Sequence, residues 1–114
     1  GLVGNAAGDL QPGRLAVKSR FTSVSANATL QPNTTDILLV NNAGGNITIT
    51  LATPAACEPN VFHIKQTAPS SNTIALSPTS GTIDGASVHV FGNALGSAGE
   101  SRMVAFDGTN WHIL

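Results

Sequence analysis

The stretch Met103-Val104-Ala105-Phe106-Asp107-Gly108-Thr109-Asn110-Trp111-His112-Ile113-Leu114 decides the fold class of this 114-residue chain. Asp-Gly is a preferred dipeptide of tight hairpin turns, and here it separates two apolar runs. In the second run, Trp111 and Ile113 point to one side of a strand and His112 to the other, because side chains alternate along a strand. The sequence therefore predicts a hairpin that closes a β-fold at the end of the chain.

Upstream, short apolar alternations are separated by clusters of Asn, Gly, Pro and Ser. Residues 46–51 alternate isoleucine or leucine with threonine, and they follow the apolar run 36–40, so these two segments are predicted to pair as a hairpin. Further strands are expected at residues 61–65, 72–76 and 87–91. Roughly eight strands spaced about ten residues apart predict an all-β fold, either a short-stranded antiparallel β-sandwich, a jelly-roll-like domain or a barrel.

The first 13 residues differ from the rest of the chain. They contain four glycines and a proline, and their apolar residues follow no strand or helix period. We therefore expect residues 1–13 to form an extended N-terminal arm and residues 14–114 to form a single all-β domain.

The composition favours a protein that packs against other subunits. Only 10% of the residues are charged, against about 25% in ordinary globular proteins, and the net charge is −1. The remaining polarity comes from hydroxyl and amide groups, which cost less to bury than charges do. No apolar run approaches the roughly 18 residues of a membrane-spanning helix. A nucleic acid and a membrane are therefore not expected as partners.

Residues 37–40 are apolar on both strand faces, which indicates burial on two sides. One cover is the domain's own core. The other is a neighbouring copy of the chain, unless the strand is central in a two-layer core. The residues expected in the core or in the contact between copies are Ile37, Leu39, Ile47, Ile49, Phe62 and Trp111.

Three of the five basic residues, Arg14, Lys18 and Arg20, fall within seven positions. They are suited to docking on an acidic protein surface, although a plain solvated strand face explains them equally simply. Without interleaved aromatic residues they make a weak footprint for nucleic acid.

The sequence offers no residues for catalysis, a cofactor or a metal. His63, His89 and His112 are more than twenty residues apart, have no ligand spacing and are expected to point outward from their strands. Cys57 is the only cysteine, and no Gly-x-Ser-x-Gly motif is present. The chain is therefore not expected to be an enzyme.

Several segments together resemble a β-domain of tailed-bacteriophage virion structural proteins. The resemblance extends from Thr35 to the end of the chain. It is carried by residues 35–42, 47–51, 62–66, 71–76, 82–85 and 106–113. This family includes tail fibres, head fibres and small capsid proteins, so the resemblance implies a homotrimer without catalytic residues.

Within that family, a short arm before the β-domain favours a capsid decoration (cement) protein over a fibre. Such a homotrimer would bind the major capsid protein on the outer head surface of the virion, after assembly in the host cytoplasm. The residues expected to contact the capsid are Leu2, Val3, Leu10, Arg14, Lys18 and Arg20. The alternative is a tail-fibre or head-fibre tip module that binds host-surface glycan through polar loops such as residues 93–99.

Overall fold

The computed structural model describes residues 18–92 and 99–114, which form nine β-strands in two sheets. The predicted all-β class is therefore confirmed. The predicted arm at residues 1–13 lies outside the described residues. In chain order the strands are β1 (Phe21–Val24), β2 (Ala28–Leu30), β3 (Ile37–Val40), β4 (Ile47–Leu51), β5 (Val61–Gln66), β6 (Ile74–Pro78), β7 (His89–Phe91), β8 (Ser101–Phe106) and β9 (Trp111–Ile113).

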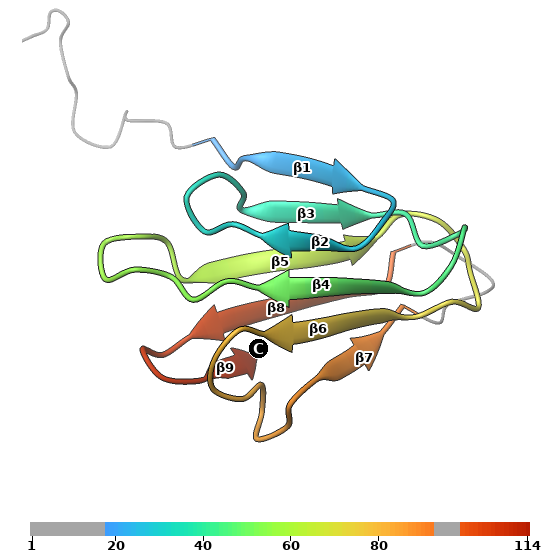
Figure 1. Cartoon of the computed structure of the whole chain (residues 1–114). Helices are drawn as coiled ribbons and strands as arrows, with labels where there is room; N and C mark the ends of the chain where they lie inside the picture. Colours follow the sequence, from blue (N-terminus) through green and yellow to red (C-terminus); the bar gives the residue numbers. More distant parts are fainter. Residues whose placement is uncertain (1–17, 93–98) are drawn as a thin grey trace, which may run out of the picture.

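The chain alternates between the two sheets along most of its length. The first sheet has the order β1-β3-β5-β8-β9 and the second has the order β2-β4-β6-β7. Figure 1 shows the second sheet in front of the first. The strands β1 to β6 form three successive coils, β1-β2, β3-β4 and β5-β6, each with one strand in either sheet. Neighbouring strands of these coils are parallel, and only β7, β8 and β9 pair in antiparallel fashion.

The predicted antiparallel architecture is therefore wrong for the three coils, and the described strands do not close into a barrel. The predicted hairpin of residues 36–40 and 46–51 is also wrong, because β3 pairs with β1 and β5 whereas β4 pairs with β2 and β6. The physical reason lies in the connection between the two strands. Asn42 is fully buried there, and its amide donates to the carbonyl oxygens of Asn72 (2.8 Å) and Gly92 (3.2 Å). These contacts hold the connection as a crossing between layers.

The core lies between the sheets and is built from inward side chains in register. In the second sheet, Ile49 aligns with Ala28 on one side and with Leu76 on the other. In the first sheet, Leu38 aligns with Ile64, and both are buried. Aligned rows bury apolar surface continuously from coil to coil, as in other coil-stacked folds.

At the C-terminal end of the coils, the first sheet is closed, whereas β7 remains the edge strand of the second sheet. The predicted hairpin is confirmed, because β8 and β9 pair in antiparallel fashion and Trp111 is fully buried. The backbone of Trp111 also donates to the carbonyl of Thr82 (2.7 Å) and accepts from the amide of Asp84 (3.0 Å). The segment that contains Thr82 and Asp84 therefore covers the outer edge of β9.

The N-terminal end of the coils is open. β1 and β2 are the edge strands of their sheets, and no strand of the described residues lies beyond them. Both strands lie at the N-terminal end of the described body (Figure 1). An open pair of edges is a site for pairing with another chain segment unless something covers it.

The aligned core rows make a direct prediction for stability. Ile49→Ala should lower the free energy of unfolding by about 2–5 kcal/mol, because it opens a cavity between Ala28 and Leu76. The matched control is Thr48→Ala, one residue away on the exposed side of β4, which should change it by less than about 0.5 kcal/mol. Urea denaturation measures both values, and equal losses would contradict the register.

Candidate interaction surfaces

The residues predicted to contact a capsid fall into three groups. Leu2, Val3, Leu10 and Arg14 lie outside the described residues. Lys18 is exposed and forms no ion pair within the described part of the chain. Arg20 is committed to internal contacts. Its guanidinium binds both carboxylate oxygens of Asp36 (3.0 and 2.9 Å) and the carbonyl oxygen of Asn33 (2.7 Å).

This ion pair has a structural role because it joins the start of β1 to the start of β3. The Asp36 carboxylate also accepts a hydrogen bond from the backbone amide of Arg20 (2.7 Å). The side-chain and backbone donors of Arg20 lower the pKa of Asp36 to about 2. Of the basic cluster, only Lys18 is therefore shown free to meet a partner's carboxylate.

The residues predicted for the core or for contact between copies divide between two locations. Ile47, Ile49, Phe62 and Trp111 are buried in the core, where they cannot touch another copy of the folded chain. By contrast, Ile37 and Leu39 are half-buried on the outer face of the first sheet, opposite the inward-facing Leu38 and Val40. β3 is therefore apolar on both faces, one of which lies in the core and the other on the outside of the sheet.

The prediction that all three histidines point outward is wrong for His89. His63 and His112 are exposed, but His89 is half-buried at the end of the core row that contains Leu76. Its Nε2 accepts a hydrogen bond from Nε of Arg102 (3.0 Å), whose guanidinium lies 4.8 Å from the centre of the Phe91 ring. Burial, and secondarily the charge of Arg102, lowers the pKa of His89. Arg102 thus joins β8 of the first sheet to β7 of the second at this edge of the core.

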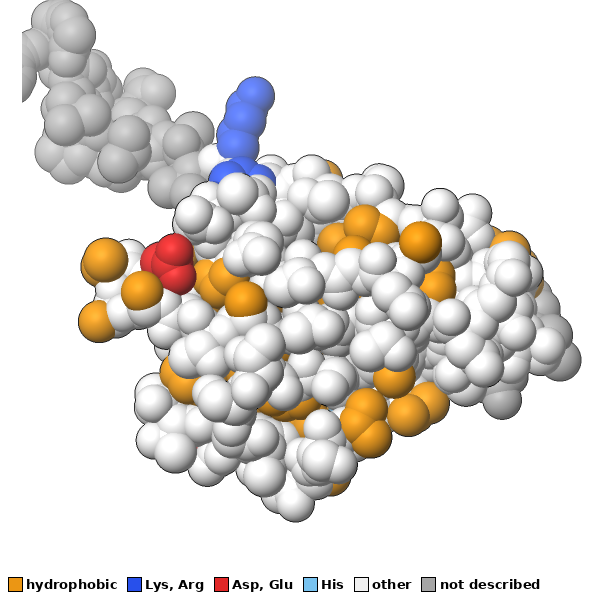
Figure 2. All heavy atoms as spheres, viewed as in Figure 1, with side chains coloured by type: hydrophobic (Ala, Val, Ile, Leu, Met, Phe, Trp, Pro, Cys, Tyr) orange, Lys and Arg blue, Asp and Glu red, His pale blue; other side chains and the backbone are white. Residues whose placement is uncertain are grey.

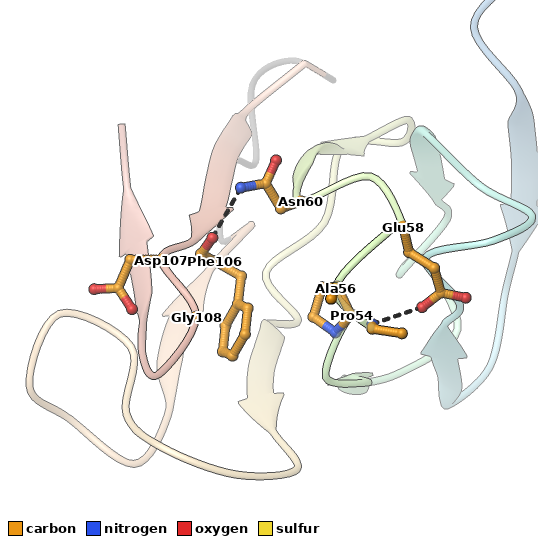
Figure 3. Close-up of a pocket in the computed structure, with 8 residues that line it drawn as sticks. Pro54, Ala56, Glu58, Asn60, Phe106, Asp107 and Gly108 are labelled. Carbon is orange, nitrogen blue, oxygen red and sulfur yellow. Dashed lines mark hydrogen bonds between the residues drawn. The ribbon is translucent and has the colours of Figure 1, made fainter.

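A hollow of about 350 Å³ lies between the loop after β4 and the turn after β8 (Figure 3). Its two acidic groups point to opposite sides of the hollow and are already bonded. Glu58 accepts from the amide of Ala55 (2.8 Å). Asp107 accepts from two turn amides and lies 2.6 Å from Nε2 of His112, and these donors lower its pKa to about 2. Neither group is placed as a proton donor for a substrate.

The described residues offer neither a metal site nor a membrane-spanning helix. Residues 18–92 and 99–114 contain no group of three or more His, Cys, Asp or Glu side chains placed to hold a metal ion. In the same residues, no helix has the length and apolar character needed to cross a membrane. Cys57 is exposed and forms no disulfide.

The outer face of the second sheet presents hydroxyl groups. Thr29, Thr50 and Ser77 align across β2, β4 and β6, and each points away from the core. Figure 2 shows this side of the molecule with scattered apolar patches and very few charged side chains. Such a face can exchange hydrogen bonds with other uncharged polar groups.

The outer face of the first sheet carries several exposed apolar side chains. Phe21, Ile37, His63 and Met103 align across four strands, and the amide of Leu114 bonds to the carbonyl of Met103 (2.8 Å). Nothing in the sequence singled out Phe21, Met103 or Leu114 as surface residues. Met103 lies in the apolar run before Asp107, which predicts a strand, but its partners become visible only once the strand order is known.

Three comparisons with known proteins found no relative. No protein-family model, no curated protein and no solved structure matches the chain.

The ion pair of Arg20 with Asp36 makes a prediction about pH. A carboxylate whose pKa is lowered stabilises the fold above its ordinary value of 3.8, and that stabilisation is lost as the pH falls towards about 2. Asp36→Asn should therefore cost about 1–2 kcal/mol at pH 7 and make stability less dependent on pH between 4 and 2. Urea midpoints across this range measure the effect.

The matched control for Asp36→Asn is Glu58→Gln, which removes a carboxylate without a basic partner among the described residues. This variant should leave the change of the urea midpoint between pH 4 and 2 as it is in wild type. Identical changes of the midpoint for wild type and Asp36→Asn would contradict the assigned role of the pair.

Proposed function

We propose that the chain is a structural protein of a bacteriophage virion, and that it acts as a capsid decoration protein. As a homotrimer, it would bind the outer head surface and stabilise the capsid. The resemblance of residues 35–114 to phage virion β-domains supports the assignment to virion structural proteins. The low charge of the chain supports a protein that packs against other subunits. No enzymatic step is part of the proposal.

The observation that carries the proposed mode of binding is the difference between the two ends of the coils. At the C-terminal end, the segment at Thr82 and Asp84 covers the edge of β9 in the first sheet and Arg102 packs on Phe91, while β7 remains the edge strand of the second sheet. At the N-terminal end, both sheets finish in an edge strand, β1 and β2, with no described strand beyond it, and the exposed Lys18 precedes β1. We place attachment to the major capsid protein at this open end and in the residues that precede it.

The proposed mechanism is mechanical. Apolar contacts at the N-terminal end would bury surface against neighbouring capsid subunits, and burial stabilises in proportion to its area. Three linked copies would bind with higher avidity than one, because the second and third contacts become intramolecular. A decoration protein of this kind would hold capsid subunits together against internal pressure.

A second candidate is a fibre-tip module that binds host-surface glycan. The hydroxyl row of Thr29, Thr50 and Ser77 favours it, because sugars are recognised by uncharged hydrogen-bonding groups. Saturable binding on a glycan array, lost when Thr50 is replaced by Val, would support this candidate over decoration.

Removal of residues 1–13 tests the decoration proposal. The shortened chain should fold and associate with itself as the full chain does, but it should no longer bind capsids, because the proposed attachment segment is gone. Co-sedimentation with capsids stripped of the protein measures binding. The control variant Val88→Ser should bind like wild type, because Val88 is exposed just before β7, at the C-terminal end of the coils and away from the proposed attachment site. Saturation of the capsids by the shortened chain would contradict the proposal.

A further inference from the structure

A row of aligned residues, apolar except for His63 at its centre, crosses the entire first sheet on its outer side. The aligned residues are Phe21, Ile37, His63, Met103 and Leu114, one from each of β1, β3, β5 and β8 and one directly after β9. Phe21 is 62% exposed, Met103 37% and Leu114 69%. Val61, at 44%, lies on the same outer side of β5. These are four of the six large hydrophobic residues exposed in the described part of the chain.

These side chains cannot withdraw into the core. The inward positions beside them hold Leu38, Ile64 and Val104, which are essentially fully buried and already fill the space between the sheets. A sheet face in contact with water normally carries polar side chains. An apolar row held outward by five paired strands therefore marks a surface that another molecule covers.

The charges on this face indicate which molecule covers it. Among the outward positions of its strands, Lys65 is the single Lys, Arg, Asp or Glu. The other polar groups of note are His63, within the row itself, and His112, which is paired with Asp107. A strongly charged partner would find almost no counter-charge here, whereas a second copy brings an equally apolar face with little like-charge repulsion.

The size of the face sets how strongly two copies would associate through it. Five strands about 4.8 Å apart, each a few residues long, make a face of roughly 400 Å². Stable interfaces bury about 800 Å² per partner, so this face alone gives weak association that depends on concentration.

We infer that the outer face of the sheet β1-β3-β5-β8-β9 is the surface through which copies of this chain associate. The inference deepens the proposed function and rests on it only for the number of copies, which the resemblance sets at three. The row from Phe21 to Leu114 supplies the apolar contact, and Ile37 and Leu39 complete their burial there.

Sedimentation equilibrium of the full chain, from micromolar to millimolar concentration, tests the inference. Wild type should rise from the mass of one chain to a dimer or trimer. Met103→Glu should weaken association at least about tenfold, because it places a charge in the middle of the apolar contact. Leu114→Glu should act in the same direction, and it leaves the core untouched if Met103→Glu fails to fold.

The matched control is Val90→Glu, at a valine that is 51% exposed on the second sheet. It should leave association unchanged. A chain that stays monomeric at every concentration would overturn the inference. So would an oligomer unaffected by Met103→Glu and Leu114→Glu, or one weakened equally by Val90→Glu.

The result is independent of the test of the proposed function. If copies associate through this face but the full chain does not bind capsids, the inference stands and decoration fails. If the chain binds capsids yet sediments as a monomer throughout, decoration stands and the inference fails.

Discussion

The alignment of inward side chains across parallel strands is the constraint on which the rest of this structure depends. A slip of one residue in any coil would turn its apolar side chains outward, because side chains alternate with a period of two. Polar contacts next to the strands, outside the apolar core, keep the strands from slipping in this way. Arg20 and Asp36 join the first coil to the second, and buried Asn42 joins the second to the third and to the start of the segment after β7. Charge is scarce in this chain, and the pair of Arg20 and Asp36 serves this purpose.

The same alignment produces the two outer faces. Once the inward rows are in register, the outward residues are in register too, so isolated side chains become continuous rows. On the second sheet the row consists of hydroxyl groups, and on the first it runs from Phe21 to Leu114. Each row thus brings together side chains that are far apart in sequence. Continuous rows on a rigid body suit contacts with other macromolecules better than chemistry on a small substrate.

Local alternation in the sequence was enough to predict strands and their buried sides, including Trp111 and the isoleucines of residues 46–51. It could not predict which strands are neighbours, because a half-buried strand has the same pattern in parallel and antiparallel sheets. That is why β3 and β4 were expected to pair, and why the end of the core row at His89 was missed. The Arg20 contact was also out of reach, since its partner Asp36 is set by the coil register. An asparagine precedes each of β2, β4 and β6 by one or two residues, and this recurrence was an available sign of repeated coils.

A rigid body with two edge strands at its N-terminal end and one largely apolar outer face fits a part that is built into a larger particle. The claim that this particle is a phage head, and that the chain covers its surface, is tested most directly by counting copies per virion with quantitative mass spectrometry. The account predicts a copy number that matches the repeating sites of the capsid lattice. A handful of copies per particle would place the chain in the tail and contradict decoration.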